Sequence, residues 1–250
     1  SSRLAHIKRR PDPEPILNDG LSSIEQFLEK VIQTIKDARV NGEPVINGDE
    51  TGWIILPHKM KTWAITNSSN VIINVKHDEH AHISAMCSIT SDFEKLPIFF
   101  IAKGSTETSE EAQLGEDIFP NVSTHSLKAF MTTECFIQYM QFIREQFPGD
   151  KTIHLIVDSY SSHVSSRSKA KAEELNIELI YIPSGYTDEY QPLDIAVFAV
   201  LKSIANSKLR HFLVDHPLTE LGMQKSVEYL IESWDSISVE TIQKGWCQYL

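Results

Sequence analysis

Ile153–Lys202 contains the segments IHLIVDSYSSH (153–163), IELIYIPSGYTDEYQPLD (177–194) and IAVFAVLK (195–202). The first begins with a short apolar run that ends in Asp158 and is followed by small polar residues. The second begins with the apolar run Ile177–Ile182 and passes through a Gly-containing loop to Asp194. Apolar runs of this length predict buried strands of an α/β protein, and such a strand holds a carboxylate at its end in a set position.

Two further carboxylates occupy comparable places in the sequence. Pro192 suits the first turn of a helix, because its missing N–H would be unpaired there anyway. Asp194 is therefore expected at a helix start, where the helix dipole stabilises a negative charge. Upstream, the apolar pair Val45-Ile46 is followed by Asp49. Three acids on separate, rigid elements are the ligands that a divalent-metal site needs.

Three blocks of this chain resemble the catalytic blocks of a DDE-superfamily transposase, in the pogo/Tigger (jerky-like) branch of the mariner superfamily. They are Asn47–Gly52, Asp158–His163 and Pro183…Thr187…Gln191-Pro192-Leu193-Asp194…Phe198…Lys202. Their order and the 36 positions from Asp158 to Asp194 fit that branch, whose third acid is Asp. Ser159 departs from the pattern, where the family usually has Asn. The resemblance extends from about Val45 to Trp246.

The resemblance implies a ribonuclease H-like (retroviral integrase-like) fold, which is an α/β mixed sheet flanked by helices. It also implies a Mg²⁺-dependent enzyme that cleaves DNA and performs strand transfer in cut-and-paste transposition. Asp49, Asp158 and Asp194 would be the catalytic metal ligands for two ions per site, with Asp49 bridging them and Mn²⁺ able to substitute. The implied partners are double-stranded DNA (transposon ends and target) and a second copy of the chain in a homodimer.

Other side chains near these acids are weaker candidates. Asp188 and Glu189 could replace Asp194 as the third ligand but lie in the loop before the helix, while Glu50 would point to the other face of a strand and is interpreted as structural. Candidates for a contact to an acid or to DNA are His163, Lys202 and Gln191. The alternative for His163 is a capping or loop role, and the alternative for Lys202 is a solvated surface position. His163 would either orient a carboxylate or touch the scissile phosphate.

Composition restricts the class of protein. A chain of 250 residues with 41% hydrophobic and 23% charged residues is typical of one large globular domain. It has neither an apolar run of membrane-spanning length nor an apolar signal core at its start, so no membrane association is expected. Three widely spaced cysteines indicate reduced thiols inside the cell, and the resemblance places the protein in the nucleus.

The net charge of −11 is unexpected for a DNA-binding protein, because affinity for DNA comes mainly from Lys and Arg that neutralise phosphates. Either basic residues gather around the site, or a separate basic module supplies the binding, in which case this chain is a catalytic fragment. The charge also keeps open a domesticated, transposase-derived protein that binds DNA or chromatin without cleaving it. A third alternative is a nuclease of this fold without strand transfer.

The order of predicted elements agrees with the implied fold. We expect a linker from a missing N-terminal DNA-binding region over 1–20, a catalytic domain over 21–215 and a C-terminal helical extension over 216–250. Apolar periodicity and turn residues predict, in order, a helix to Asn41, an antiparallel meander over 51–103, a surface loop over 106–117, a helix capped by Thr132 or Thr133, strand 153–157, helix 166–175, strand 177–182, and helices 192–212, 218–233 and 239–248.

Two other patterns are interpreted as structural. The run from His77 to His82 lacks a distant Cys/His pair that would complete a zinc site, so a charged turn is expected there. The four tryptophans, Trp53, Trp63, Trp234 and Trp246, are expected in the core rather than stacked on bases.

Overall fold

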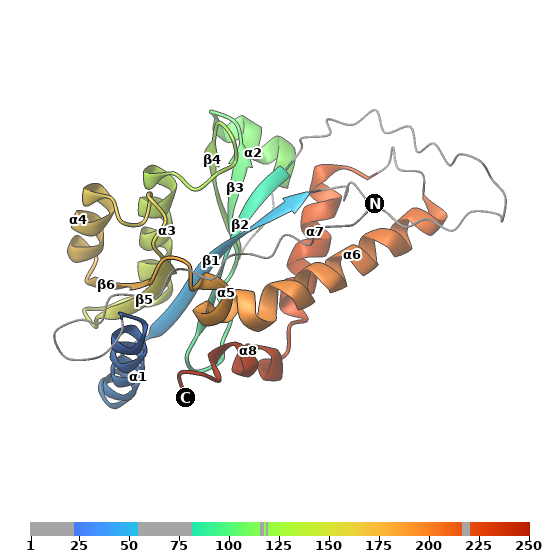
Figure 1. Ribbon diagram of the computed structural model, residues 1–250. Helices are drawn as coiled ribbons and strands as arrows, with labels where there is room; N and C mark the ends of the chain where they lie inside the picture. The colour runs from blue at the N-terminus through green and yellow to red at the C-terminus, as the bar shows by residue number, and fades with distance from the viewer. Residues whose placement is uncertain (1–22, 55–81, 116–117, 119, 217–220) are drawn as a thin grey trace, which may run out of the picture.

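A six-stranded sheet with the strand order β4-β3-β2-β1-β5-β6 forms the centre of the molecule (Figure 1). The computed structural model describes residues 23–54, 82–115, 118, 120–216 and 221–250. The strands are β1 (Val45–Ile54), β2 (His82–Thr90), β3 (Phe99–Lys103), β4 (Val122–Ser126), β5 (Ile153–Asp158) and β6 (Ile177–Ile182).

The sheet is mixed, and β1 lies at the boundary between its two halves. β1, β2 and β3 pair in antiparallel fashion, whereas β5 pairs parallel to β1 and β6 parallel to β5. A three-stranded meander followed by strands added in parallel through helical crossovers is the topology of the ribonuclease H-like fold. The predicted fold class is therefore confirmed.

Helices cover both faces of the sheet, and each face has its own hydrophobic core. On one face α3 and α4 pack over side chains such as Ile46 and Leu155. On the other face α1, α6, α7 and α8 pack over side chains such as Val45 and Ile156. The helices are α1 (Ser23–Asn41), α2 (Glu107–Leu114), α3 (Thr133–Gln146), α4 (Ser166–Glu174), α5 (Thr187–Tyr190), the π-helix η1 (Leu193–Val197), α6 (Phe198–Asp215), α7 (Met223–Asp235) and α8 (Val239–Trp246).

Local sequence signals explain where several helices begin and end. The side chain of Thr132 accepts a hydrogen bond from the backbone of Cys135 and caps α3, and Ser165 caps α4 in the same way through Ser168. α1 ends before Gly42, whose φ of 66° is a left-handed conformation that glycine adopts without strain. These boundaries follow the sequence prediction closely.

The prediction of a surface loop over 106–117 was wrong, because residues 107–114 form α2. Buried Leu114 joins the core, and the side-chain amide of Gln113 exchanges two hydrogen bonds with the backbone of Lys103 at the end of β3. Tertiary contacts therefore stabilise a helix whose own apolar pattern is weak. The sequence prediction also missed β4, a short edge strand parallel to β3.

Two further boundaries differ from the prediction. Trp53 does not begin a separate strand, because β1 runs without interruption to Ile54 and so has Asp49 in its interior rather than at its end. The predicted helix from Pro192 begins as the π-helix η1, in which the N–H of Phe198 donates to the carbonyl of Leu193, and becomes α-helical only afterwards. The part of the predicted meander over 55–81 lies outside the described residues, and so does the charged turn predicted from His77 except for its last residue, His82.

The C-terminal helices share one core with the helices before them. The core cluster that contains the inner face of α6 also contains Trp234, Trp246 and Tyr249, which are nearly inaccessible to solvent. Trp53 is buried as well, so these tryptophans lie in the core as expected. Trp63 lies outside the described residues. Among the helices of the described residues, none is both long and apolar enough to cross a bilayer. The proposed domain boundaries stay predictions.

Candidate active site

Asp49 occupies the centre of the sheet, in the middle of β1 and opposite Cys87 of β2. Its side chain is buried, and the backbone N–H of Glu50 donates to its Oδ1 at 2.9 Å. Burial raises the pKa of the Asp49 carboxyl well above its ordinary value, and the charges of three neighbouring acids raise it further: Glu50, Asp194 and Asp158. The charges of the other two acids of the sequence blocks, Asp158 and Asp194, therefore act on Asp49.

Asp158 ends β5, which lies beside β1, and it is partly exposed. Its Oδ1 accepts a hydrogen bond from the backbone of Tyr160 at 3.2 Å and one from Nδ1 of His163 at 2.7 Å. Burial alone would raise the pKa of this carboxyl, but the hydrogen bond and charge of His163 outweigh burial and lower it. His163 therefore favours the ionised form of Asp158, whereas burial and the neighbouring acids oppose the ionisation of Asp49.

Asp194 lies in the first turn of η1 and is exposed to solvent. Leu193 and Val197 of the same π-helical turn are buried in the core. They fix η1 in place while the side chain of Asp194 faces solvent. Asp188 and Glu189 lie in the short helix α5 rather than in a loop, and both are exposed. Neither is among the groups whose charge raises the pKa of Asp49, whereas Asp194 is.

A pair of buried amides joins the elements that carry the three acids. Nδ2 of Asn47 on β1 donates to Oε1 of Gln191 at 2.6 Å and to the carbonyl of Ile156 on β5 at 3.1 Å. Oδ1 of Asn47 accepts from the backbone of Leu193, and Nε2 of Gln191 donates to the carbonyl of Gly48. Gln191 also hydrogen-bonds to Asp49 and so acts against the rise in its pKa. Both amides are fully buried, so Gln191 lies in the interior of the protein and not on its surface.

Glu50 projects from the opposite side of β1 to Asp49, as predicted, but it is not remote from the site. Its Oε1 lies 3.2 Å from Nε2 of His163, so His163 connects Glu50 to Asp158. Ligand atoms of these three side chains lie within 4.8 Å of one another, a spacing that could hold a metal ion. Both imidazole nitrogens are already hydrogen-bonded to carboxylate oxygens, which argues for a hydrogen-bonded cluster instead.

Lys202, two turns along the helix from Asp194, is partly buried. Its positive charge acts on the thiol of Cys87, the residue paired with Asp49 across the sheet, although burial outweighs that charge and raises the pKa of the thiol. Lys202 therefore lies near the acids. Cys87 and Cys135 are buried and free, and Cys247 is free and exposed.

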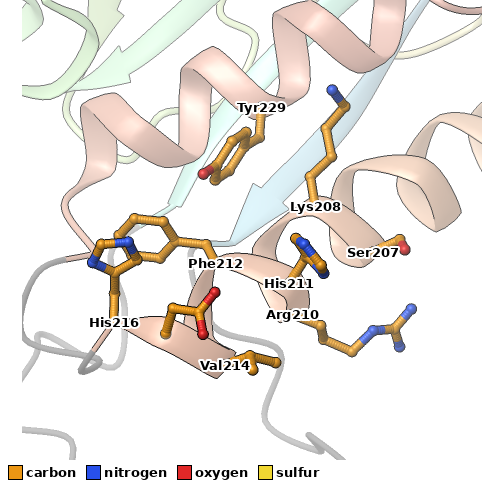
Figure 2. A pocket seen from close by; sticks show the side chains of 9 residues that line it. Ser207, Lys208, Arg210, His211, Phe212, Val214, His216 and Tyr229 are labelled. Atoms are coloured by element: carbon orange, nitrogen blue, oxygen red, sulfur yellow. The ribbon is translucent and has the colours of Figure 1, made fainter.

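A surface hollow lies at the far end of α6, well away from the acids. Figure 2 shows its lining, in which the rings of Phe212 and His216 stack at 4.4 Å and Tyr229 approaches from α7. Lys208 in this hollow forms an ion pair with Glu232 at 2.6 Å. The lining thus mixes basic groups with Asp215, and it shares no residue with the acidic site.

A family model described as DDE superfamily endonuclease matches residues 80–246, which is more than half of the chain. This chain belongs to the DDE superfamily endonucleases. The matched residues include Asp158 and Asp194. Asp49 lies before the matched region, on β1, which pairs with β2 on one side and with β5 on the other.

Similar proteins carry transposon-related names. The "Pogo transposable element with KRAB domain" of Mus musculus is 21% identical to this chain, and that of Homo sapiens is 23% identical. Each match covers 94% of this chain, which spans only 40% of the length of those relatives. Among solved structures, the "Mos1 transposase paired-end complex with left transposon end" has a TM-score of 0.45 at 10% identity and covers 92% of this chain and 66% of that one. The "catalytic domain of Mos1 mariner transposase" has a TM-score of 0.44 at 10% identity, with coverages of 90% and 94%.

The donor set of this DDE superfamily member fits a hard divalent cation. Asp49, Asp158 and Asp194 supply carboxylate oxygens, which Mg²⁺ and Mn²⁺ prefer. Without a cation, the negative charges of Asp158 and Asp194 act on buried Asp49 and oppose its ionisation. A bound cation would offset this repulsion among the three carboxylates. The repulsion is the observation that supports a metal here.

Sequence reasoning did not assign a role to Asn47, and it interpreted Glu50 as structural without identifying its contact with His163. Asn47 stands within the first block, and a polar residue flanked by apolar neighbours in a central strand is a signal that could have indicated a buried hydrogen-bonding role. No comparable signal exists for Glu50, because its partner His163 is distant in sequence and becomes a neighbour only in the fold.

Proposed function

We propose that this chain is the catalytic domain of a transposase that cleaves DNA and joins DNA strands in cut-and-paste transposition, using divalent metal ions. The observation that carries the proposal is the convergence of Asp158 and Asp194 on buried Asp49, from three separate elements, in a member of the DDE superfamily. A cluster of acids in which one is buried destabilises the metal-free protein, and a metal-dependent reaction gives a reason to retain it.

Asp49, Asp158 and Asp194 would hold two Mg²⁺ ions, for which Mn²⁺ could substitute. When bound, such a pair supplies charge stabilisation for the attacking and leaving oxygens of a phosphodiester. The protein's own part is positioning: His163 holds Asp158, and the amides of Asn47 and Gln191 hold β1 against η1. The attacking group would be water in cleavage and a DNA 3′-hydroxyl in strand transfer.

The partners follow from the same proposal. Double-stranded DNA, as transposon end and as target, would approach the exposed side of Asp194, and the chain would act as a homodimer in the nucleus. The net charge of −11 indicates that much of the DNA affinity comes from outside this chain.

That same charge favours one other function, a domesticated protein that binds DNA or chromatin and no longer cuts. The two functions make different demands on the acids. A protein that only binds has no use for carboxylates that converge on a buried Asp49, since they repel both one another and DNA.

The deciding experiment is a nicking and strand-transfer assay with the full-length protein on DNA carrying its terminal inverted repeats, with Mg²⁺ or Mn²⁺. Asp158→Asn and Asp158→Ala should lower the rate by more than about 100-fold, because even groups that only hydrogen-bond to a metal ligand are worth about 10–100-fold. Asp150→Asn, at an exposed position just before β5, is the matched control and should cut normally.

The outcomes separate the candidates. Continued cutting by the Asp158 variants would remove the proposed mechanism. DNA binding by the wild-type protein without any cutting, in either metal, would favour the domesticated function. Cleavage without joining would identify a nuclease that does not transfer strands.

A further inference from the structure

His163 is clamped between two carboxylates at the edge of the acidic site. Nδ1 lies 2.7 Å from Oδ1 of Asp158, and Nε2 lies 3.2 Å from Oε1 of Glu50. The imidazole is only 1% exposed and packs against the ring of Phe136 at 4.3 Å between centroids. A buried ring with both nitrogens engaged has a single orientation, so it cannot reach a DNA phosphate without leaving this arrangement.

The backbone around His163 is held as firmly as its ring. Its N–H donates to the carbonyl of Tyr160, and its own carbonyl accepts from the hydroxyl of Tyr181 at 3.1 Å. Oδ1 of Asp158 accepts both hydrogen bonds that the described residues offer to this carboxylate. Its second oxygen, Oδ2, is therefore the one available to a cation.

We propose that Glu50 is a positioning residue for metal binding: through His163 it fixes the Asp158 carboxylate so that Oδ2 is presented to a cation. Glu50 itself is not a ligand, because it lies on the other face of β1 from Asp49 and faces His163. The proposal rests on the proposed function only in that a metal binds at Asp158. Groups that orient a metal ligand in this way are worth about 10–100-fold in metal affinity.

The chain contains a second histidine clamped in the same manner, which provides a matched control. Nδ1 of His154 lies 2.8 Å from Oε2 of Glu178, and Nε2 lies 3.3 Å from Oε2 of Glu43. Glu43 and Glu50 have equally exposed side chains, at 20% each, and both accept from a histidine Nε2. His154 is at the start of β5, whereas Asp158 is at its end, so the Glu43 pair is separated from the acids by the length of the strand.

The test is a calorimetric titration of the chain with Mn²⁺ alone, without DNA, for wild type, Glu50→Gln, Glu50→Ala and Glu43→Gln. We expect Glu50→Ala to weaken Mn²⁺ binding by about 10–100-fold. Glu50→Gln should weaken it less, because its amide oxygen still accepts from Nε2 of His163. Glu43→Gln should bind within about twofold of wild type. Urea unfolding of the same variants measures any change in stability separately.

A purely structural role for Glu50 makes a different prediction. Glu50→Gln and Glu43→Gln would then lose similar stability, and all folded variants would bind Mn²⁺ like wild type, which would overturn the proposal. If Glu50→Ala does not fold, the comparison is made between the Mn²⁺ affinities of the nearly isosteric Glu50→Gln and of Glu43→Gln. Failure of wild type to bind Mn²⁺ would instead contradict the metal site itself, and with it the proposed function.

Discussion

The side chains of Asn47 and Gln191 are hydrogen-bonded at 2.6 Å in the buried interior, although 144 positions separate them in the chain. Asn47 is two residues before Asp49, and Gln191 is three residues before Asp194. Through this contact, and through the bond from Asn47 to the carbonyl of Ile156, the strand of the first acid is joined to the elements of the other two. The geometry of the acids therefore depends on two neutral amides.

Asn47→Ala should lower both stability and activity. It removes the hydrogen bonds that Nδ2 of Asn47 donates to Oε1 of buried Gln191 and to the carbonyl of Ile156, at a cost of about 1–3 kcal/mol in the free energy of unfolding. The measurements are urea unfolding and metal-dependent nicking. Asn121→Ala is the control, because Asn121 is also buried and hydrogen-bonded to backbone at Ile98 and Ile118 but lies between β3 and β4. It should lose similar stability and keep its cutting rate once folded.

Asp49→Asn should stabilise the metal-free protein while abolishing cleavage. Burial and neighbouring acids raise the pKa of this carboxyl above its ordinary value of 3.8. Between these two pKa values the folded protein binds a proton that the unfolded chain has lost, so stability falls as pH rises through this window. The neutral amide removes that cost, and a melting temperature measured at neutral pH in EDTA should rise, by about 2–4 °C for each kcal/mol recovered.

The same measurement has an outcome that would contradict this account. If Asp49 were stabilised as a carboxylate by its surroundings, Asp49→Asn would melt at a lower temperature than wild type. Added Mn²⁺ should raise the melting temperature of wild type and leave that of the variant unchanged, because a cation that binds only the folded state stabilises it.

His163→Gln should change the pH dependence of stability on the alkaline side. Burial alone would lower the pKa of His163, but its hydrogen bonds to Asp158 and Glu50 raise it to about 10 from an ordinary 6.5. The stabilisation is complete below pH 6.5 and is lost as pH rises toward 10, with a slope of up to about 1.4 kcal/mol per pH unit. Urea unfolding at a series of pH values should show a smaller loss across this range in the variant. Parallel curves would show that the imidazolium does not stabilise the fold.

Gly245→Ala should disturb the third acid from a distance. A Cβ at Gly245 of α8 would lie 2.5 Å from the carbonyl oxygen of Pro192 and 3.1 Å from its carbon, so the backbone that begins η1 must move. We expect a loss of about 1–3 kcal/mol and weaker Mn²⁺ binding. Gly52→Ala is the control, since nothing lies within 4 Å of its added Cβ, and its stability should equal or exceed that of wild type.

Sequence reasoning was most successful where the signal is local. The Thr132 cap of α3, the end of α1 at Asn41, the start of α4 at Ser166 and the apolar runs of β5 and β6 depend on residues within a few positions of one another, and all were predicted. It failed for α2, which packs against β3, β4 and α7, and for β4, which pairs with β3. It also could not recognise the π-helical start of the Pro192 helix. A propensity or periodicity pattern contains no information about contacts made by the folded chain.

The sequence by itself determined the fold class, the order of the blocks and membership in the DDE superfamily, because strand and helix patterns and block spacing are written along the chain. Only the tertiary structure decided that the charges of Asp158 and Asp194 act on Asp49, that Asn47 is hydrogen-bonded to Gln191, and that Glu50 is connected to Asp158 through His163. The reason is physical: electrostatic interactions and hydrogen bonds depend on distance in space. These partners are more than 100 positions apart in the sequence and become neighbours only when the sheet forms.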